Sequence, residues 1–157
     1  MGESWASSPG RRRNMQAIRS RDTAPEIAVR RLLHAMGLRY RVHYKPIPTL
    51  NRRADIVFTR QKVAVFIDGC FWHGCPEHGS SSFRENPEYW SHKIRTNVER
   101  DRETDTVLES HGWRILRLWT HSDPVSMAQI IALTVRSIDS GLRDIVSGVC
   151  SCEPPLD

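Results

Sequence analysis

One short stretch constrains this chain more than any other: residues 63–78, which read VAVFIDGCFWHGCPEH. It starts with five apolar residues, from Val63 to Ile67, a pattern typical of a buried strand. The carboxylate of Asp68 ends the strand, and Gly69 lets the backbone turn. The loop that follows carries two thiols, two imidazoles and a pair of large aromatic rings. A strand that delivers an acid beside metal-ligand side chains predicts a functional site at its end.

The size and apolar content of the chain indicate a single soluble domain. Its 157 residues can bury a core of their own. No apolar run approaches the roughly 20 residues that cross a bilayer, and no apolar signal core begins the chain. We therefore expect a cytoplasmic monomer with no membrane partner. We divide it into a flexible basic arm (1–20), one domain (21–146) and a loose tail (147–157).

Charge is distributed unevenly along the chain. The first 60 residues carry 13 Lys and Arg against 4 Asp and Glu, whereas the remainder carries 10 against 14. A basic front half favours a polyanionic partner, with nucleic acid the leading candidate. The alternative is a basic surface that serves only solubility.

Periodicity and turn residues predict an α/β fold. Thr23, Pro25 and Glu26 mark the start of a helix that Gly37 ends. Further helices are expected at 87–110 and 124–140, and strands at 39–44, 54–58, 63–67 and 113–119; the strand, helix and strand from 63 to 119 form a crossover unit. The expected inward faces are Ile27, Leu32, Leu33 and Met36 in the first helix and Tyr89, Trp90, Ile94, Val98 and Leu108 in the second.

Two carboxylates sit in apolar strands that are expected to pair. An acid such as Asp55 or Asp68 is costly there unless it is paired, hydrogen-bonded or bound to a metal. Together with Glu26 they could assemble around Mg²⁺, which prefers oxygen ligands. The nearby His73 could then move a proton. On a basic protein this combination points to a nuclease.

Simpler explanations exist for two of these acids. Asp55 could form a salt bridge with Arg52 or Arg53. Glu26 could serve only as a helix cap. Both alternatives remain open at the level of the sequence.

The cysteines and histidines have spacings that suit one metal ion. Cys70, Cys75 and His78, with His121 at the end of a later strand, could form a closed Cys2His2 site of the kind that holds structural Zn²⁺. His73 could replace His78 in this set. The alternative is free thiols and surface histidines.

The adjacent rings of Phe71 and Trp72 form a third motif. Such a pair could wedge between base pairs, and unstacking costs less at a mismatch. The alternative is that the rings cover the hydrophobic core.

Taken together, these residues resemble the very-short-patch-repair (Vsr) family of DNA mismatch endonucleases. The resemblance covers about residues 11–122. It is carried by Arg13-Asn-Met15 with Asp22-Thr-Ala-Pro-Glu26, Arg53-Ala-Asp55, Asp68-Gly-Cys-Phe-Trp-His73, Lys93-Ile-x-x-Asn-Val-Glu-Arg-Asp101 and Gly112-Trp-Arg114.

The resemblance implies a fold, a reaction and partners. It implies a restriction-endonuclease-like mixed sheet flanked by helices, with a structural zinc site. The expected reaction is Mg²⁺-dependent nicking of one strand of duplex DNA beside the thymine of a T·G mismatch, which arises when 5-methylcytosine deaminates. The expected setting is the bacterial cytoplasm and nucleoid, with other mismatch-repair proteins as partners.

The same resemblance implies roles for individual residues. Asp55 would bind the catalytic metal, and the backbone carbonyl of Ile67 would add a ligand. His73 would be the general base and Glu26 a supporting acid. The implied zinc ligands are Cys70, Cys75, His78 and His121, and the implied DNA contacts are Met15, Phe71, Trp72, Asn97, Arg13 and Arg19.

Two departures from the family pattern bear on these roles. Phe66 and Asp68 stand where a restriction-type acid and lysine would be, and the best-known family pattern has a histidine at the position of Asp68. We place Asp68 in the catalytic centre, as a direct ligand if it binds Mg²⁺. Cys75 and His78 replace a histidine and a cysteine, which keeps two thiolates and two imidazoles if His121 completes the set.

Two other functions compete with mismatch nicking. One is a DNA-binding module without catalysis, in which zinc only holds the loop. The other is a restriction-like nuclease that cuts matched DNA.

Overall fold

Apolar strands form the centre of the molecule. The computed structural model describes residues 21–78 and 87–141. The sheet has the order β1-β2-β3-β4, in which the first three strands pair antiparallel and β3 pairs parallel to β4. The strands are β1 (Arg41–Tyr44), β2 (Ala54–Phe58), β3 (Val63–Asp68) and β4 (Arg114–Trp119), and the helices are α2 (Ala24–Ala35), α3 (Pro87–Ser110) and α4 (Pro124–Asp139).

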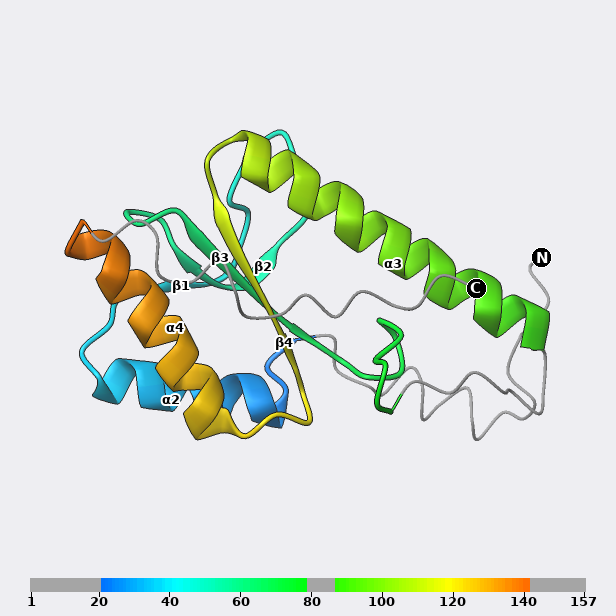
Figure 1. The fold of residues 1–157 in the computed structure, drawn as a ribbon, viewed down its shortest axis with the longest axis horizontal. Helices are drawn as coiled ribbons and strands as arrows, with labels where there is room; N and C mark the ends of the chain where they lie inside the picture. The colour runs from blue at the N-terminus through cyan, green and yellow to red at the C-terminus, as the bar shows by residue number, and fades with distance from the viewer. Residues whose placement is uncertain (1–20, 79–86, 142–157) are drawn as a thin grey trace.

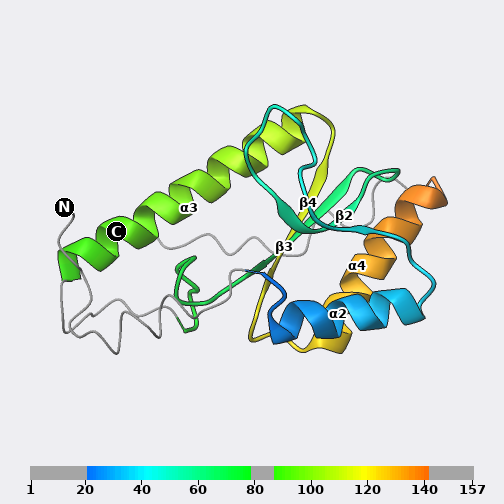
Figure 2. The same ribbon diagram turned by 180° about the vertical axis from the view of Figure 1, so that it is seen from behind.

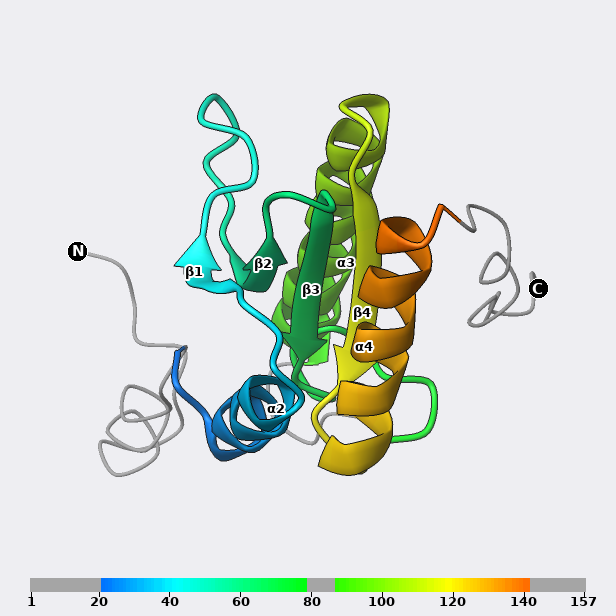
Figure 3. The ribbon, with the colours of Figure 1, turned by 90° about the vertical axis from the view of Figure 1, so that its left-hand side faces the viewer.

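Helices cover both faces of this mixed sheet, which confirms the expected architecture. Figure 3 shows α2 and α4 on one side of the strands and α3 on the other. Val29 and Leu33 of α2 and Ile131 of α4 are fully buried against the first face. Phe66 and Leu108 belong to a smaller cluster on the second face. The sheet therefore lies between two apolar layers.

The predicted inward face of α2 is only partly right. Leu33 is buried, but Ile27 is half-buried, and Leu32 and Met36 are partly buried residues at the edge of the core. Val29, which is not among the predicted residues, is fully buried as well. The helix is rotated because it rests on both the sheet and α4, whereas the sequence pattern shows only where apolar residues recur.

The long helix α3 differs more from its prediction. Its outer half extends past the sheet beside the loop of residues 69–78 (Figures 1 and 2). Leu108 is buried as expected, but Tyr89 is 39% exposed. The remaining predicted core residues, Trp90, Ile94 and Val98, are half-buried and lie on the part of the helix that faces this loop.

A close approach between that loop and α3 explains the difference. Gly74 has a φ of +63°, and a Cβ at this residue would lie 3.3 Å from Ile94 and 3.7 Å from Val98. The apolar stripe of the outer helix is therefore covered by a loop. Periodicity predicted the stripe correctly but assigned it to the wrong partner.

Some of the expectations fall on other parts of the chain. The basic arm (1–20), with Arg13, Met15 and Arg19, and the tail (147–157) lie outside the described residues. Within the described ranges, no helix is long and apolar enough to span a membrane.

Two substitutions in α4 test the core. Ile131→Ala should lower the free energy of unfolding by about 2–5 kcal/mol, because Ile131 is fully buried between α4 and the sheet. Leu133→Ala on the same helix is the control, since Leu133 is 67% exposed, and it should change stability by less than about 0.5 kcal/mol. Urea unfolding measures both, and equal losses would contradict the assigned core.

Candidate functional site

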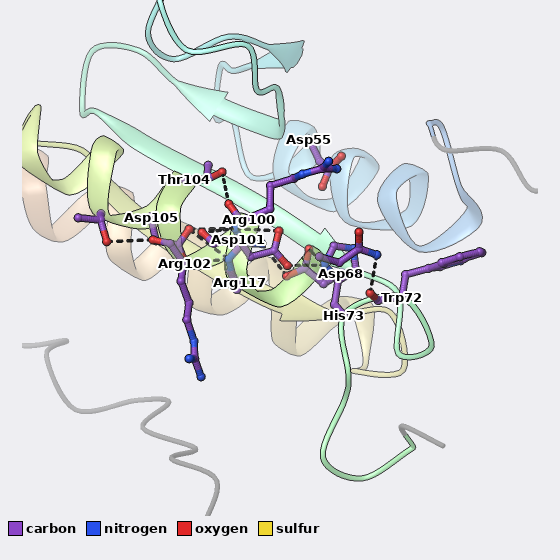
Figure 4. Close-up of polar contacts among 12 residues, drawn as sticks. Asp55, Asp68, Trp72, His73, Arg100, Asp101, Arg102, Thr104, Asp105 and Arg117 are labelled. Atoms are coloured by element: carbon purple, nitrogen blue, oxygen red, sulfur yellow. Dashed lines mark hydrogen bonds and ion pairs between the residues drawn. The ribbon is translucent and has the colours of Figure 1, made fainter. Parts of the chain in front are cut away.

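A cleft opens where β3 leaves the sheet. Its volume is about 650 Å³, and it lies between the end of β3, the loop that follows, the start of α2 and the middle of α3. Figure 4 shows the polar side chains that converge at this point. The lining includes eight of the predicted site residues: Glu26, Asp55, Ile67, Asp68, Cys70, Phe71, Trp72 and His73.

Asp55 is held at the point where β2 and β3 separate. The pairing of these strands ends at Ile56 and Val65. Two residues further along β3, the backbone N–H of Ile67 donates to Oδ2 of Asp55 at 2.7 Å. The carboxylate thus replaces a missing strand partner. This bond fixes Asp55 at the floor of the cleft.

The environment of Asp55 disfavours its charged form. Burial raises the pKa of Asp55 to about 6, against the opposing effect of the Ile67 hydrogen bond, and the charges of Glu26 and Asp68 add to the rise. Within the described ranges Asp55 forms no ion pair with Arg52, so that alternative is not realised. Arg53, the other candidate, instead donates to the carbonyl of His43.

Three partly desolvated carboxylates around one cleft fit a divalent cation. A cation would offset the burial of Asp55 and its repulsion from Glu26 and Asp68. Their oxygens belong to the ligand class that Mg²⁺ prefers. Ile67 lines the same cleft, beside Asp55. The chemistry of these side chains therefore suits a hard divalent cation.

Glu26 lies both at the start of α2 and in the wall of the cleft. It is only 4% exposed, and its carboxylate accepts from the N–H of Asp22 at 3.0 Å and the hydroxyl of Thr23 at 2.8 Å. Arg30 donates to it at 2.6 Å. Thr23 makes no side-chain cap bond, and Glu26 accepts from the N–H of Asp22 and not from that of the N-cap residue, so the expected reciprocal capping box is not formed. Glu26 stabilises the start of α2 and also lines the cleft.

His73 belongs to the cleft and not to the cysteine cluster. Its Nδ1 lies 2.6 Å from Oδ2 of Asp101 and 3.7 Å from Oδ1 of Asp68. Burial lowers the pKa of His73, but the bond to Asp101 and the charges of both acids outweigh it, so the net pKa is raised. Because a carboxylate can only accept, the Nδ1 atom carries the proton. In the neutral imidazole, the other ring nitrogen, Nε2, is then the proton acceptor.

Two members of this group were not identified from the sequence. The sequence includes Asp101 only as the last residue of a motif that carries the family resemblance, and it gives Arg117 no role within the strand expected at 113–119. Arg117 donates to Asp68 at 2.9 Å and to Asp105 at 2.9 Å (Figure 4). A charged residue within an apolar strand is the same signal that singled out Asp55, so Arg117 could have been found by it.

The four predicted zinc ligands converge at the end of β4. Cys70 Sγ lies 2.9 Å from His121 Nδ1, and Cys75 Sγ lies 3.9 Å from Nδ1 of both His78 and His121. All four ligand atoms lie within 4.8 Å of one another. Ligands about 2.0–2.3 Å from a tetrahedral zinc ion lie roughly 3.5 Å apart. Glu77 lies 3.4 Å from Nε2 of His121 and can orient that ring.

The aromatic pair forms a cluster at the mouth of the cleft. Phe71 and Trp72 meet edge to face at 5.0 Å, and Trp90 of α3 contacts the two rings at 5.2 and 6.0 Å. Phe71 and Trp72 are half-buried and belong to neither core cluster, so they do not cover the core. Asn97, an expected DNA contact, donates to the carbonyl of Trp72 at 2.9 Å and holds the loop against α3.

Known proteins are similar to this chain in sequence. The family profile described as DNA mismatch endonuclease Vsr matches residues 6–78. Type II nicking enzyme V.NaeI of Lentzea aerocolonigenes is 46% identical over 134 residues, which cover 84% of this chain and 80% of that protein. Type II nicking enzyme V.XorIIP of Xanthomonas oryzae pv. oryzae is 42% identical over 113 residues (71% and 81%). DNA mismatch endonuclease Vsr of Escherichia coli is 39% identical over 112 residues (69% and 68%).

A solved structure also matches. It is the catalytic domain of the homing endonuclease I-Bth0305I, with a TM-score of 0.46 and 18% sequence identity, over 76% of this chain and 97% of that domain.

The partly buried carboxyl of Asp55 gives a prediction about stability. The pKa of Asp55 rises from its ordinary value of 3.8 to about 6 on folding, so the folded state binds this proton more tightly than the unfolded state. The resulting stability is complete below pH 4 and is lost as the pH rises through 6. At pH 7, without added divalent cations, Asp55→Asn should therefore raise the free energy of unfolding by roughly 1–3 kcal/mol.

Urea unfolding at pH 4 and pH 7 measures this effect. The gain should shrink at pH 4, where the wild-type carboxyl is largely neutral. Asp139→Asn, at the exposed end of α4, is the control and should show no such gain. A variant that is less stable than wild type at pH 7 would show that Asp55 is not held as a costly anion.

Proposed function

This chain belongs to the Vsr family of DNA endonucleases, and we propose that it nicks one strand of duplex DNA beside the thymine of a T·G mismatch, with Mg²⁺ as its catalytic cation. The observation that carries the proposal is a single cleft lined by Asp55, His73, Phe71 and Trp72. Side chains that can open a base pair thus lie beside side chains that can hydrolyse a phosphodiester. The relatives named as nicking enzymes support cleavage of one strand.

The cation would be held by Asp55, with the backbone carbonyl of Ile67 as a further ligand. When bound there, it would supply positive charge for the phosphate in the transition state. Glu26 would support this site from the start of α2, through its bonds to Thr23 and Arg30. Arg52 also lines the cleft and would attract the phosphate backbone.

His73 would act as the general base. Asp101 accepts from Nδ1 and so fixes the tautomer, which leaves Nε2 to take a proton from the attacking water. An acid that orients an imidazole in this way is a recurrent arrangement in hydrolases. Protonated His73 could then return the proton to solvent or to the leaving oxygen.

Phe71 and Trp72 would provide the wedge. Inserting rings between base pairs costs a few kcal/mol of stacking, and less at a mismatch, so the cost itself favours flawed duplexes. The rings need a rigid base to do this, and Trp90 and Asn97 provide it from α3. Arg13, Met15 and Arg19 are proposed as further DNA contacts.

Nicking of defined duplexes tests the reaction. With Mg²⁺, the wild-type protein should nick a T·G duplex on the thymine strand and leave a T·A control intact. Asp55→Asn should lose at least about 10³-fold in rate, because the variant lacks the charge that would hold the cation. Asp139→Asn should retain activity.

Other outcomes would identify the competing functions. Comparable cleavage of the T·A duplex would favour a restriction-like nuclease. Tight binding to T·G without nicking in any divalent metal would favour a binding module. Equal inactivity of wild type and Asp55→Asn on the mismatch would rule out the proposed reaction.

We also propose that Cys70, Cys75, His78 and His121 hold a structural Zn²⁺. Two thiolates and two imidazoles form a closed set for this ion, and the set joins the loop to the end of β4. Elemental analysis should find about one zinc per chain. Cys70→Ser with Cys75→Ser should lose the zinc and lower thermal stability, because the ion contributes to folding. Full retention of zinc would refute the ligand set.

A further inference from the structure

We propose that Arg117 is a positioning residue of the nuclease centre, and that Asp68 is its counter-ion and not a ligand of the catalytic cation. The proposal rests on the proposed role of His73. It follows from one juxtaposition: a guanidinium on β4 lies among carboxylates from β3 and α3, one of which binds the histidine (Figure 4).

Every nitrogen of Arg117 is engaged by a carboxylate. Nη1 donates to Asp68 Oδ2 at 2.9 Å, while Nε and Nη2 donate to the two oxygens of Asp105, each at 2.9 Å. Nη2 also lies 3.5 Å from Oδ1 of Asp101 and 3.4 Å from its backbone carbonyl. The guanidinium stacks 4.5 Å from the ring centre of Phe66. Arg117 is therefore committed to the protein and is not available to bind a DNA phosphate.

The two oxygens of Asp101 have different partners. Oδ1 faces Arg117, whereas Oδ2 accepts from Nδ1 of His73 at 2.6 Å. The arginine thereby limits rotation of the carboxylate that orients the imidazole. Its position also joins three parts of the fold, because Arg117 lies on β4, Asp101 on α3 and His73 in the loop after β3. A group that fixes Asp101 acts on His73 without touching substrate.

The negative charge of Asp68 has a different partner from that of Asp55. Asp68 is 7% exposed, and a carboxylate buried to this extent requires a partner. Arg117 supplies a full positive charge to one of its oxygens, and the other faces His73. Asp55 forms no ion pair within the described part of the chain; its carboxylate accepts a hydrogen bond from the N–H of Ile67. The acid without a basic partner is the one that gains most from a cation.

A counter-ion of Arg117 and a ligand of Mg²⁺ should respond differently to substitution of Asp68. A metal ligand changes the affinity for the metal when it is replaced, whereas a counter-ion of Arg117 changes the rate through the histidine. Substitutions of Asp68 and of Arg117 should therefore lower the nicking rate through the same interaction, and their effects should not add.

Kinetics on the zinc-loaded, full-length protein test this. Arg117→Met should reduce the single-turnover nicking rate on a T·G duplex about 10- to 100-fold. The affinity for duplex and the Mg²⁺ concentration at half-maximal rate should stay within about twofold of wild type. Arg117→Lys should restore only part of the rate, because one ammonium cannot span three carboxylates. Arg102→Met is the control, because Arg102 follows Asp101 on α3 but its exposed side chain points away from the charge cluster (Figure 4).

The role of Asp68 is tested by Asp68→Asn and by the double variant. Asp68→Asn should lower the rate without raising the Mg²⁺ requirement, and adding Arg117→Met should lower it no further than the more damaging single substitution. A large rise in the Mg²⁺ requirement for Asp68→Asn, or independent effects of the two substitutions, would overturn the inference. A wild-type rate in Arg117→Met would do the same.

A spectroscopic measurement separates this inference from the proposed function. The ¹⁵N shifts of the His73 ring, identified by their loss in His73→Gln, should report protonation at Nδ1 in the wild type and a mixed tautomer in Arg117→Met. If wild type nicks no duplex but the tautomer still depends on Arg117, only the proposed function fails. If wild type nicks and the tautomer does not change in the variants, the inference fails. If Arg117→Met does not fold, Arg117→Lys and Asp68→Asn provide the same comparison.

Discussion

The site depends on the burial of β3 along its whole length. All six of its residues are buried, with the sheet continued on both sides and apolar layers above and below. A strand buried in this way gives no access to water or substrate. The functional groups therefore lie where the strand ends. There β2 turns away, and Asp55 takes the N–H that β2 no longer pairs. The same hydrogen bond that completes the sheet places an acid in the cleft.

The loop after β3 is fixed from two directions. On one side the cluster of Cys70, Cys75, His78 and His121 ties it to the end of β4. On the other side Asn97 bonds to the carbonyl of Trp72, and Gly74 lets the outer half of α3 approach. Aromatic rings on an untethered loop would collapse on the nearest apolar surface. Held in this way, they remain at the mouth of the cleft.

The bounds of several helices and strands, and most of the candidate site residues, could be predicted from the sequence because they depend on local patterns. The helix expected at 87–110 and the strand expected at 54–58 have those bounds in the structure, since proline, glycine and hydrophobic period act over a few residues. The acids stand out because a carboxylate is costly in an apolar strand, and the cysteine cluster stands out because its spacings suit one metal ion. The same argument applied to β4 would have identified Arg117.

Partner choice, by contrast, was decided only by the tertiary structure. The sequence determined that His73 and His78 both stood near the thiols, but folding sent one to Asp101 and the other to the cysteines. It determined an apolar stripe on α3, but not that a loop would cover half of it. The sequence around a charged or aromatic residue does not identify its partner, because that partner can lie about fifty positions away. Only the packing of sheet, helix and loop brings the two together.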